Sequence, residues 1–171
     1  MTLSSLKPEL RFDETVFPRQ GRERPAVRLS ASVWLPLPPD ELFPFFSDAA
    51  NLQTLTPPWL DFRILTPLPI EMRPGALIRY RIRVRGLSFG WLTEISEWDP
   101  RRGFVDQQLR GPYALWHHRH GFQPLDGGTL ATDVVHYWPK GGRLADRLFV
   151  RRDVARIFAY RSEKLLELFG R

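Results

Sequence analysis

Residues 111–138 have the sequence GPYALWHHRHGFQPLDGGTLATDVVHYW. Its two halves, in which large and polar side chains alternate, flank the dipeptide Asp126-Gly127. A period of two is typical of β-strands, and Asp-Gly is a preferred two-residue hairpin turn. The stretch therefore predicts an antiparallel hairpin in which Leu125 pairs with Gly128, and this pairing sets the register of every later pair.

Further short strands are expected on the N-terminal side of this hairpin. The clearest alternation places aliphatic and aromatic side chains at positions 78, 80, 82 and 84 on one face and arginines on the other. Pro, Gly or Asp residues separate most of these segments, as in an antiparallel meander. The predicted strands are residues 26–35, 61–65, 76–85, 89–95, 104–109, 114–122 and 129–138.

Two short helices and one long helix complete the predicted fold. Pro39-Asp40-Glu41 is typical of a helix start, and a second short turn is expected at residues 51–56. After the last strand, apolar side chains recur at three- and four-residue steps, which predicts an amphipathic helix of about 26 residues. Its inner face would carry Leu144, Leu148, Ala155, Phe158, Ser162, Leu165 and Phe169. The fold class is α+β, with a curved antiparallel sheet of about seven strands wrapped around the long C-terminal helix.

Length and composition limit the kind of protein further. A chain of 171 residues is expected to form one domain, here residues 26–171. Residues 1–25 mix charges of both signs with Pro, and we expect a partly disordered extension that is not a signal peptide. The chain has no Cys, which excludes disulfides and thiolate chemistry. No apolar run reaches about 18 residues, so we expect a cytoplasmic protein without a transmembrane segment.

Four stretches of the sequence carry a family resemblance: residues 37–52, residues 56–62, Tyr80 with Gly86 and residues 91–95, and residues 104–129. They resemble the START/birch-pollen-allergen-like (SRPBCC) superfamily, in particular its polyketide cyclase/dehydrase and coenzyme-Q-binding branches. The resemblance covers about residues 27–169 and implies a helix-grip fold, in which sheet and C-terminal helix enclose a deep apolar cavity for lipids, polyketides, quinones or hormones. Members either catalyse or only carry a ligand, so the resemblance leaves the function open.

The most informative candidate site lies on the strand at residues 114–122. Its inward face, marked by the aromatic residues Trp116 and Phe122, also carries His118 and His120. The hairpin register places His120 opposite Asp133 on the next strand. Directly opposed side chains lie about 4.5–5.5 Å apart at Cβ, so this His and Asp can form a hydrogen bond or ion pair.

The preceding strand adds polar groups to the same wall. If the connection is the three-residue segment 111–113, Asp106 lies opposite His118 and Gln108 lies opposite Trp116. Buried polar groups need partners, which can be one another, water or a ligand.

Three interpretations of this wall remain open: it orients a polar group of an apolar ligand, it only rigidifies the sheet, or it catalyses. In the third, His118 or His120 is a general acid–base that Asp106 or Asp133 orients. The leading function is binding of a small hydrophobic ligand for carriage or sequestration, and the alternative is a polyketide aromatase/cyclase or dehydratase. The candidate ligand-binding residues are Tyr80, Trp91, Asp106, Gln108, Trp116, His118, His120, Asp133, Tyr137 and Phe158.

His118 and His120 are also a possible metal-binding pair, with Asp106 or Asp133 as a third ligand. Two His residues at this spacing on a strand are common by chance, and the resembled family is not generally metal-dependent. We therefore assign no metal and no cofactor.

The net charge of +6 does not by itself indicate a nucleic-acid partner. All but three of the 25 basic residues are Arg, and they are spread along the chain without long basic runs. Four of them form an outward stripe on one strand, where we expect pairing with Glu94 and Glu97 of the neighbouring strand and weak contact with anionic surfaces. The stripe consists of Arg79, Arg81, Arg83 and Arg85.

Overall fold

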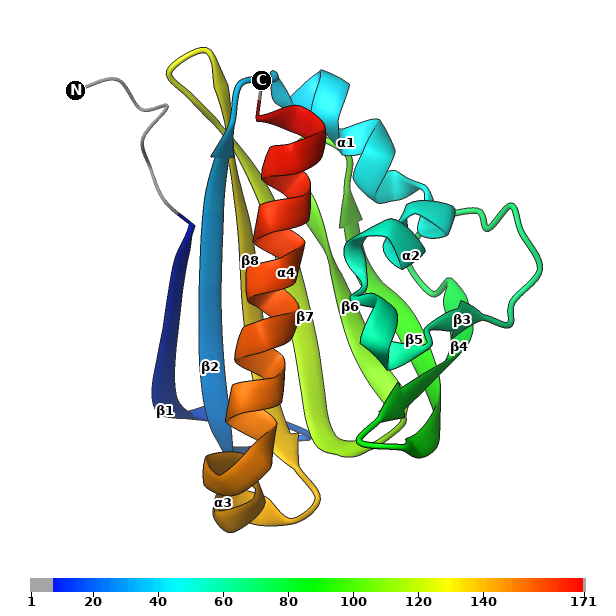
Figure 1. The fold of residues 1–171 in the computed structure, drawn as a ribbon, viewed down its shortest axis with the longest axis vertical. Helices are drawn as coiled ribbons and strands as arrows, with labels where there is room; N and C mark the ends of the chain where they lie inside the picture. The colour runs from blue at the N-terminus through cyan, green and yellow to red at the C-terminus, as the bar shows by residue number, and fades with distance from the viewer. Residues whose placement is uncertain (1–7, 171) are drawn as a thin grey trace.

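The computed structural model describes residues 8–170 as one eight-stranded antiparallel sheet that curves around a long C-terminal helix (Figure 1). The spatial order of the strands is β1-β2-β8-β7-β6-β5-β4-β3. The strands are β1 (Glu9–Arg19), β2 (Arg22–Leu35), β3 (Arg63–Ile64), β4 (Leu77–Val84), β5 (Leu87–Asp99), β6 (Gly103–Arg110), β7 (Tyr113–Leu125) and β8 (Gly128–Pro139). The predicted α+β fold class, with a curved sheet and a C-terminal helix, is confirmed.

The helical segments cover one face of this sheet. Two short helices follow β2, as the sequence predicts, and the longest helix lies across the sheet (Figure 1). Within residues 8–170, no helix combines the length and the apolar character needed to cross a membrane. The helical segments are α1 (Pro39–Ser47), η2 (Ala49–Asn51), α2 (Leu52–Leu55), η3 (Pro58–Leu60), α3 (Gly142–Ala145), η4 (Asp146–Val150) and α4 (Arg151–Phe169).

The β7–β8 hairpin has the predicted register. Leu125 pairs with Gly128, and the pairing continues to His120 opposite Asp133. The two turn residues between the strands both have positive φ, 47° for Asp126 and 77° for Gly127. A type I′ turn requires this conformation at both central positions, and Gly adopts it without steric cost.

The N-terminal segment differs from the sequence expectation. Residues 1–7 lie outside the described part of the chain, but residues 9–19 form β1, which pairs with β2 along its whole length. The proposed domain start at residue 26 therefore falls inside β2. As an edge strand, β1 leaves most of its side chains exposed, and only Leu10 and Phe12 pack against the core. Because so little of β1 is buried, its hydrophobic alternation is weak in the sequence. With β1 included, the sheet has eight strands, one more than the seven predicted.

The C-terminal helix also differs from the expectation in its first third. Phe158, Ser162 and Leu165 are buried on the inner face, as predicted, whereas Leu144 and Leu148 are 70% and 57% exposed. Leu148 lies in the π-helical segment η4, which connects α3 to α4. A π turn holds more residues than an α turn, so it breaks the three- and four-residue phase that the sequence pattern assumes.

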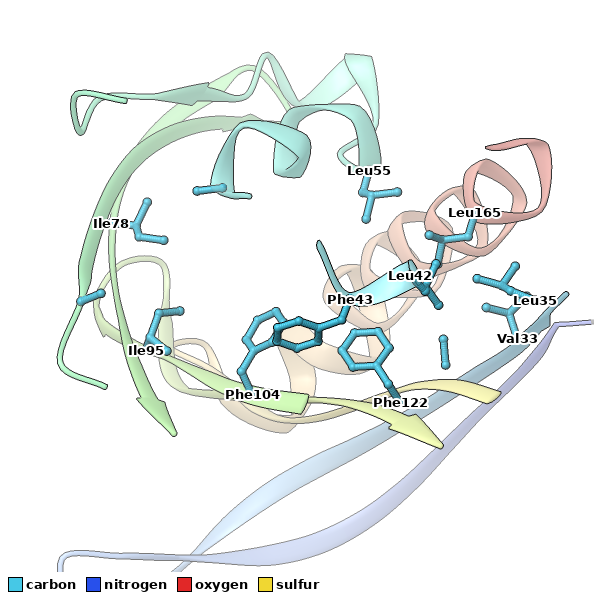
Figure 2. Close-up of a cluster of buried hydrophobic side chains, with 13 residues drawn as sticks. Val33, Leu35, Leu42, Phe43, Leu55, Ile78, Ile95, Phe104, Phe122 and Leu165 are labelled. Atoms are coloured by element: carbon cyan, nitrogen blue, oxygen red, sulfur yellow. The ribbon is translucent and has the colours of Figure 1, made fainter. Parts of the chain in front are cut away.

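One buried cluster fixes α1 and α4 on the sheet (Figure 2). Phe43 of α1 packs against Phe122 of β7, and Leu165 of α4 belongs to the same cluster. Full burial of each such side chain contributes about 1.5–3 kcal/mol. Phe104 of β6 also belongs to this cluster, and its ring stacks on His120 with centroids 4.1 Å apart. The core therefore extends to the polar wall and holds it in place.

Candidate functional site

A cavity of about 410 Å³ lies between the inner face of the sheet and the helices. Its wall is mainly aliphatic and aromatic, with contributions from β4–β7, the short helices after β2 and α4. Seven of the ten predicted ligand-binding residues lie in this wall: Tyr80, Trp91, Asp106, Trp116, His118, His120 and Phe158. Phe45 and Phe46 of α1 also line the cavity.

The other three predicted residues do not line the cavity. The side-chain amide of Gln108 donates to the backbone oxygen of Tyr113 (2.8 Å) and accepts from its N–H (3.2 Å), which braces the β6–β7 connection. The paired residues of these strands end at Gln107 and His117, so Gln108 is not paired with Trp116 as predicted.

Tyr137 and Asp133 lie behind the cavity wall. Tyr137 is fully buried, and its hydroxyl donates to Asp146 Oδ1 at 2.7 Å. Asp133 contacts both histidines of the wall from the side away from the cavity. These two residues therefore support the wall without being part of its surface.

His118 and His120 lie side by side between two carboxylates. Their ring centroids are 3.8 Å apart. At one end, Asp106 Oδ2 lies 2.8 Å from His120 Nε2 and 3.4 Å from His118 Nδ1. At the other end, Asp133 Oδ1 lies 2.8 Å from His118 Nε2 and 3.1 Å from His120 Nδ1. Each ring nitrogen thus faces a carboxylate oxygen.

The pairing within this network is partly diagonal. The register opposes Asp106 to His118 and His120 to Asp133, as the sequence predicts. The shortest contacts instead join His118 to Asp133 and His120 to Asp106, both at 2.8 Å. An imidazole ring is long enough to place a nitrogen beside each neighbouring strand, so strand register alone does not determine the partner.

Arg161 of α4 completes the network and is not among the site residues that the sequence predicts. Its side chain is 8% exposed; Nε donates to Asp133 Oδ2 at 2.9 Å, and Nη2 lies 3.3 Å from His120 Nδ1. Arg161 also lines the cavity. It lies three residues after Phe158 and four before Leu165, and this helical spacing could have placed it on the buried face.

The carboxyl groups of the network are held in their ionised form. Burial raises the pKa of Asp133, but Arg161 and the two histidines outweigh it and bring this pKa well below the ordinary value. Burial likewise raises the pKa of Asp106, and His118, His120 and Arg161 lower it below the usual range. Both acids are therefore available as acceptors for ring N–H groups.

The two histidines have opposite pKa shifts although they are neighbours. Burial and the nearby His120 lower the pKa of His118. Burial also lowers the pKa of His120, but its hydrogen bonds to Asp106 and Asp133 raise it overall above the ordinary value. The hydrogen bonds to the two carboxylates favour the protonated form of His120, whereas burial favours the neutral form of His118. The wall can thus present both a proton donor and an acceptor to the cavity.

The outward Arg stripe lacks the expected partners. Arg79 lies opposite Leu92, and Glu94 lies opposite Leu77 and accepts from the side-chain amide of Gln107. The register therefore offsets the acids from the arginines. Arg85, at the end of the stripe, instead forms an ion pair with Asp153 of α4 at 2.8 Å.

Comparisons with known proteins agree with this architecture. Residues 35–158 match the family model described as polyketide cyclase/dehydrase and lipid transport. No curated protein sequence matches the chain. Protein CV1439 from Chromobacterium violaceum has a similar structure, with a TM-score of 0.66 at 15% identity over 84% of this chain and 97% of its own.

Two further solved structures share the fold. Protein Ms6760 from Mycobacterium smegmatis has a TM-score of 0.62 at 18% identity over 82% of this chain and 89% of its own. Ara h 8.0201 has a TM-score of 0.57 at 18% identity over 82% of this chain and 97% of its own. At such identities, the similarity shows the fold alone.

Proposed function

The chain belongs to the polyketide cyclase/dehydrase and lipid transport family, and we propose that it binds a small, mainly apolar molecule in its cavity for carriage or sequestration. The observation that carries this proposal is the composition of the cavity wall, which is mainly aromatic and aliphatic and carries His118, His120 and Asp106 among its polar residues. A volume of about 410 Å³ lies within the range of pockets for small molecules, roughly 300–1,000 Å³.

The geometry of the wall indicates the shape and chemistry of the ligand. Trp91 contacts Tyr80 in a stacked arrangement at 5.5 Å and meets Trp116 edge to face at 5.3 Å, which gives a flat aromatic lining. His118 and His120 lie on the neighbouring part of the wall. We infer a flat or elongated ligand whose carbonyl, hydroxyl or carboxylate group lies against these histidines, as for a lipid, polyketide or quinone.

The binding proposal is tested with a fluorescent apolar probe, 1-anilinonaphthalene-8-sulfonate. Trp116→Ala removes one face of the lining, and we expect weaker probe binding by at least tenfold. Trp59→Ala is the matched control, because Trp59 is 49% exposed and does not line the cavity. Equal affinity of both variants and the unchanged protein would contradict binding in this cavity.

A second candidate function is a cyclase or dehydratase. The specific observation in its favour is that each cavity-lining histidine is hydrogen-bonded to a carboxylate. In a dehydration, neutral His118 would remove a proton from the carbon beside a carbonyl, and protonated His120 would protonate the departing hydroxyl, which leaves as water. The test is incubation with a β-hydroxyacyl thioester. Loss of one water by mass spectrometry, abolished in His120→Gln, supports catalysis, and an unchanged substrate argues for carriage.

We propose that this activity takes place in the cytoplasm and belongs to the domain predicted at residues 26–171, to which the N-terminal strand β1 adds an edge strand. No nucleic-acid partner is proposed, because the basic residues are spread along the chain without long runs and Arg85 of the stripe is paired with Asp153 of α4. The same stripe provides weak attraction to anionic surfaces, such as the headgroups of a lipid-bearing membrane.

A further inference from the structure

Three potential metal-ligand atoms meet on the cavity side of the polar wall. Asp106 Oδ2 lies 2.8 Å from His120 Nε2 and 3.4 Å from His118 Nδ1. Asp106, His118 and His120 each offer a ligand atom, and these atoms all lie within 4.8 Å of one another. Ligands about 2.0–2.2 Å from one ion are themselves separated by roughly 3–3.5 Å, which is close to the two contacts that Asp106 makes with the histidines.

The second nitrogens of the two rings share one carboxylate partner, and His120 Nδ1 also lies 3.3 Å from Arg161 Nη2. His118 Nε2 and His120 Nδ1 lie 2.8 and 3.1 Å from the same atom, Asp133 Oδ1. A neutral imidazole carries a single N–H. When both N–H groups donate to Asp133, the lone pairs of His118 Nδ1 and His120 Nε2 point to the side of Asp106. Metal-bound histidines commonly donate their other N–H to a carboxylate in this way.

Within the described residues, only one of the two carboxylates forms a direct ion pair with a Lys or Arg. Arg161 forms an ion pair with Asp133 at 2.9 Å. Within residues 8–170, no Lys or Arg lies at ion-pair distance from Asp106, whose only such partners are the two histidines. Asp106 lines the cavity, whereas Asp133 does not. Asp106 is therefore the carboxylate that can accept a cation, and it is also the one that a ligand in the cavity would contact.

We propose that Asp106, His118 and His120 bind one divalent first-row transition-metal ion of the zinc or iron(II) class, with Asp133 positioning both histidines. Two nitrogen ligands and one carboxylate suit these ions and leave further coordination positions open toward the cavity. This inference goes beyond the proposed function and does not depend on it, since an apolar molecule can bind the aromatic lining without a metal.

A proton shared by His120 and Asp106 would account for the same short contact, so the test must distinguish a proton from a metal. The protein is stripped with a chelator, dialysed and titrated with Co²⁺, a spectroscopic probe, and with Zn²⁺ by calorimetry. We expect visible d–d absorption from bound Co²⁺ and one Zn²⁺ per chain. Asp106→Asn and His118→Ala should abolish both signals, and Asp133→Asn should weaken Zn²⁺ binding about 10–100-fold.

His117→Ala is the matched control, because His117 lies on the same strand and contacts Phe17 instead of lining the cavity. This variant should bind Zn²⁺ like the unchanged protein. Absence of d–d absorption in the unchanged, folded protein would overturn the proposal, as would undiminished binding by Asp106→Asn. Binding of 1-anilinonaphthalene-8-sulfonate is measured in parallel. If the protein binds this probe but no metal, the metal site is refuted and the binding function is not.

Discussion

Replacement of Arg161 by Met tests whether the buried network depends on a charge from α4. The Arg161 and Asp133 side chains are 8% and 13% exposed and are joined by a 2.9 Å contact. Met preserves most of the apolar stem but removes the guanidinium, which leaves the Asp133 carboxylate buried without its strongest cationic partner. Loss of one partner of a buried pair costs about 3–5 kcal/mol.

The expected consequence is a large fall in the free energy of unfolding, measured by urea denaturation. For a domain of this size, about 3–5 kcal/mol corresponds to a decrease in Tm of roughly 6–20 °C. Arg152→Met is the matched control on the same helix, because Arg152 is exposed, and it should change stability by at most about 0.5 kcal/mol.

A double-mutant cycle identifies the cause of this loss. In Arg161→Met/Asp133→Asn, the carboxylate that forms the ion pair with Arg161 is absent, so we expect the double variant to be more stable than the sum of the two single losses implies. Additive losses, or an Arg161→Met variant within about 1 kcal/mol of the unchanged protein, would refute the reasoning.

Three further outcomes follow from other contacts. Tyr137→Phe removes the hydroxyl that donates to the fully buried Asp146, and it should cost about 1–3 kcal/mol in urea denaturation, whereas Tyr160→Phe should cost little. Gly127→Val forces a β-branched residue into the positive-φ turn position and should cost at least about 1 kcal/mol; an unchanged denaturation midpoint would contradict the turn assignment. Zn²⁺ affinity measured by calorimetry should fall as the pH is lowered from about 7.5 to about 5.5, because protons compete for the ligand atoms; a constant affinity would argue against His ligands.

The features that the sequence predicted correctly depend on local patterns. The alternation in residues 114–122 and the Asp126-Gly127 turn determine the β7–β8 register, and this register places His120 opposite Asp133. Aromatic neighbours on the same strand face were sufficient to mark the histidines as inward. The polar wall could therefore be anticipated before any coordinates were known.

The features that the sequence did not reveal depend on packing between distant segments. Strand β1 buries few side chains, so its pairing leaves little trace in its hydrophobic pattern. The charge on Arg161 concealed a position whose spacing from Phe158 and Leu165 is that of the buried helix face. The diagonal His–Asp contacts result from side-chain orientation, which strand register does not determine.

The central claim, that the cavity holds a small apolar molecule with one polar group, is tested most directly by native mass spectrometry of the protein purified from cell extract. We predict a mass above that of the chain by one organic molecule, which denaturing solvent releases and which can then be identified. The mass of the chain alone in repeated preparations, unchanged after addition of 1-anilinonaphthalene-8-sulfonate, would contradict the claim.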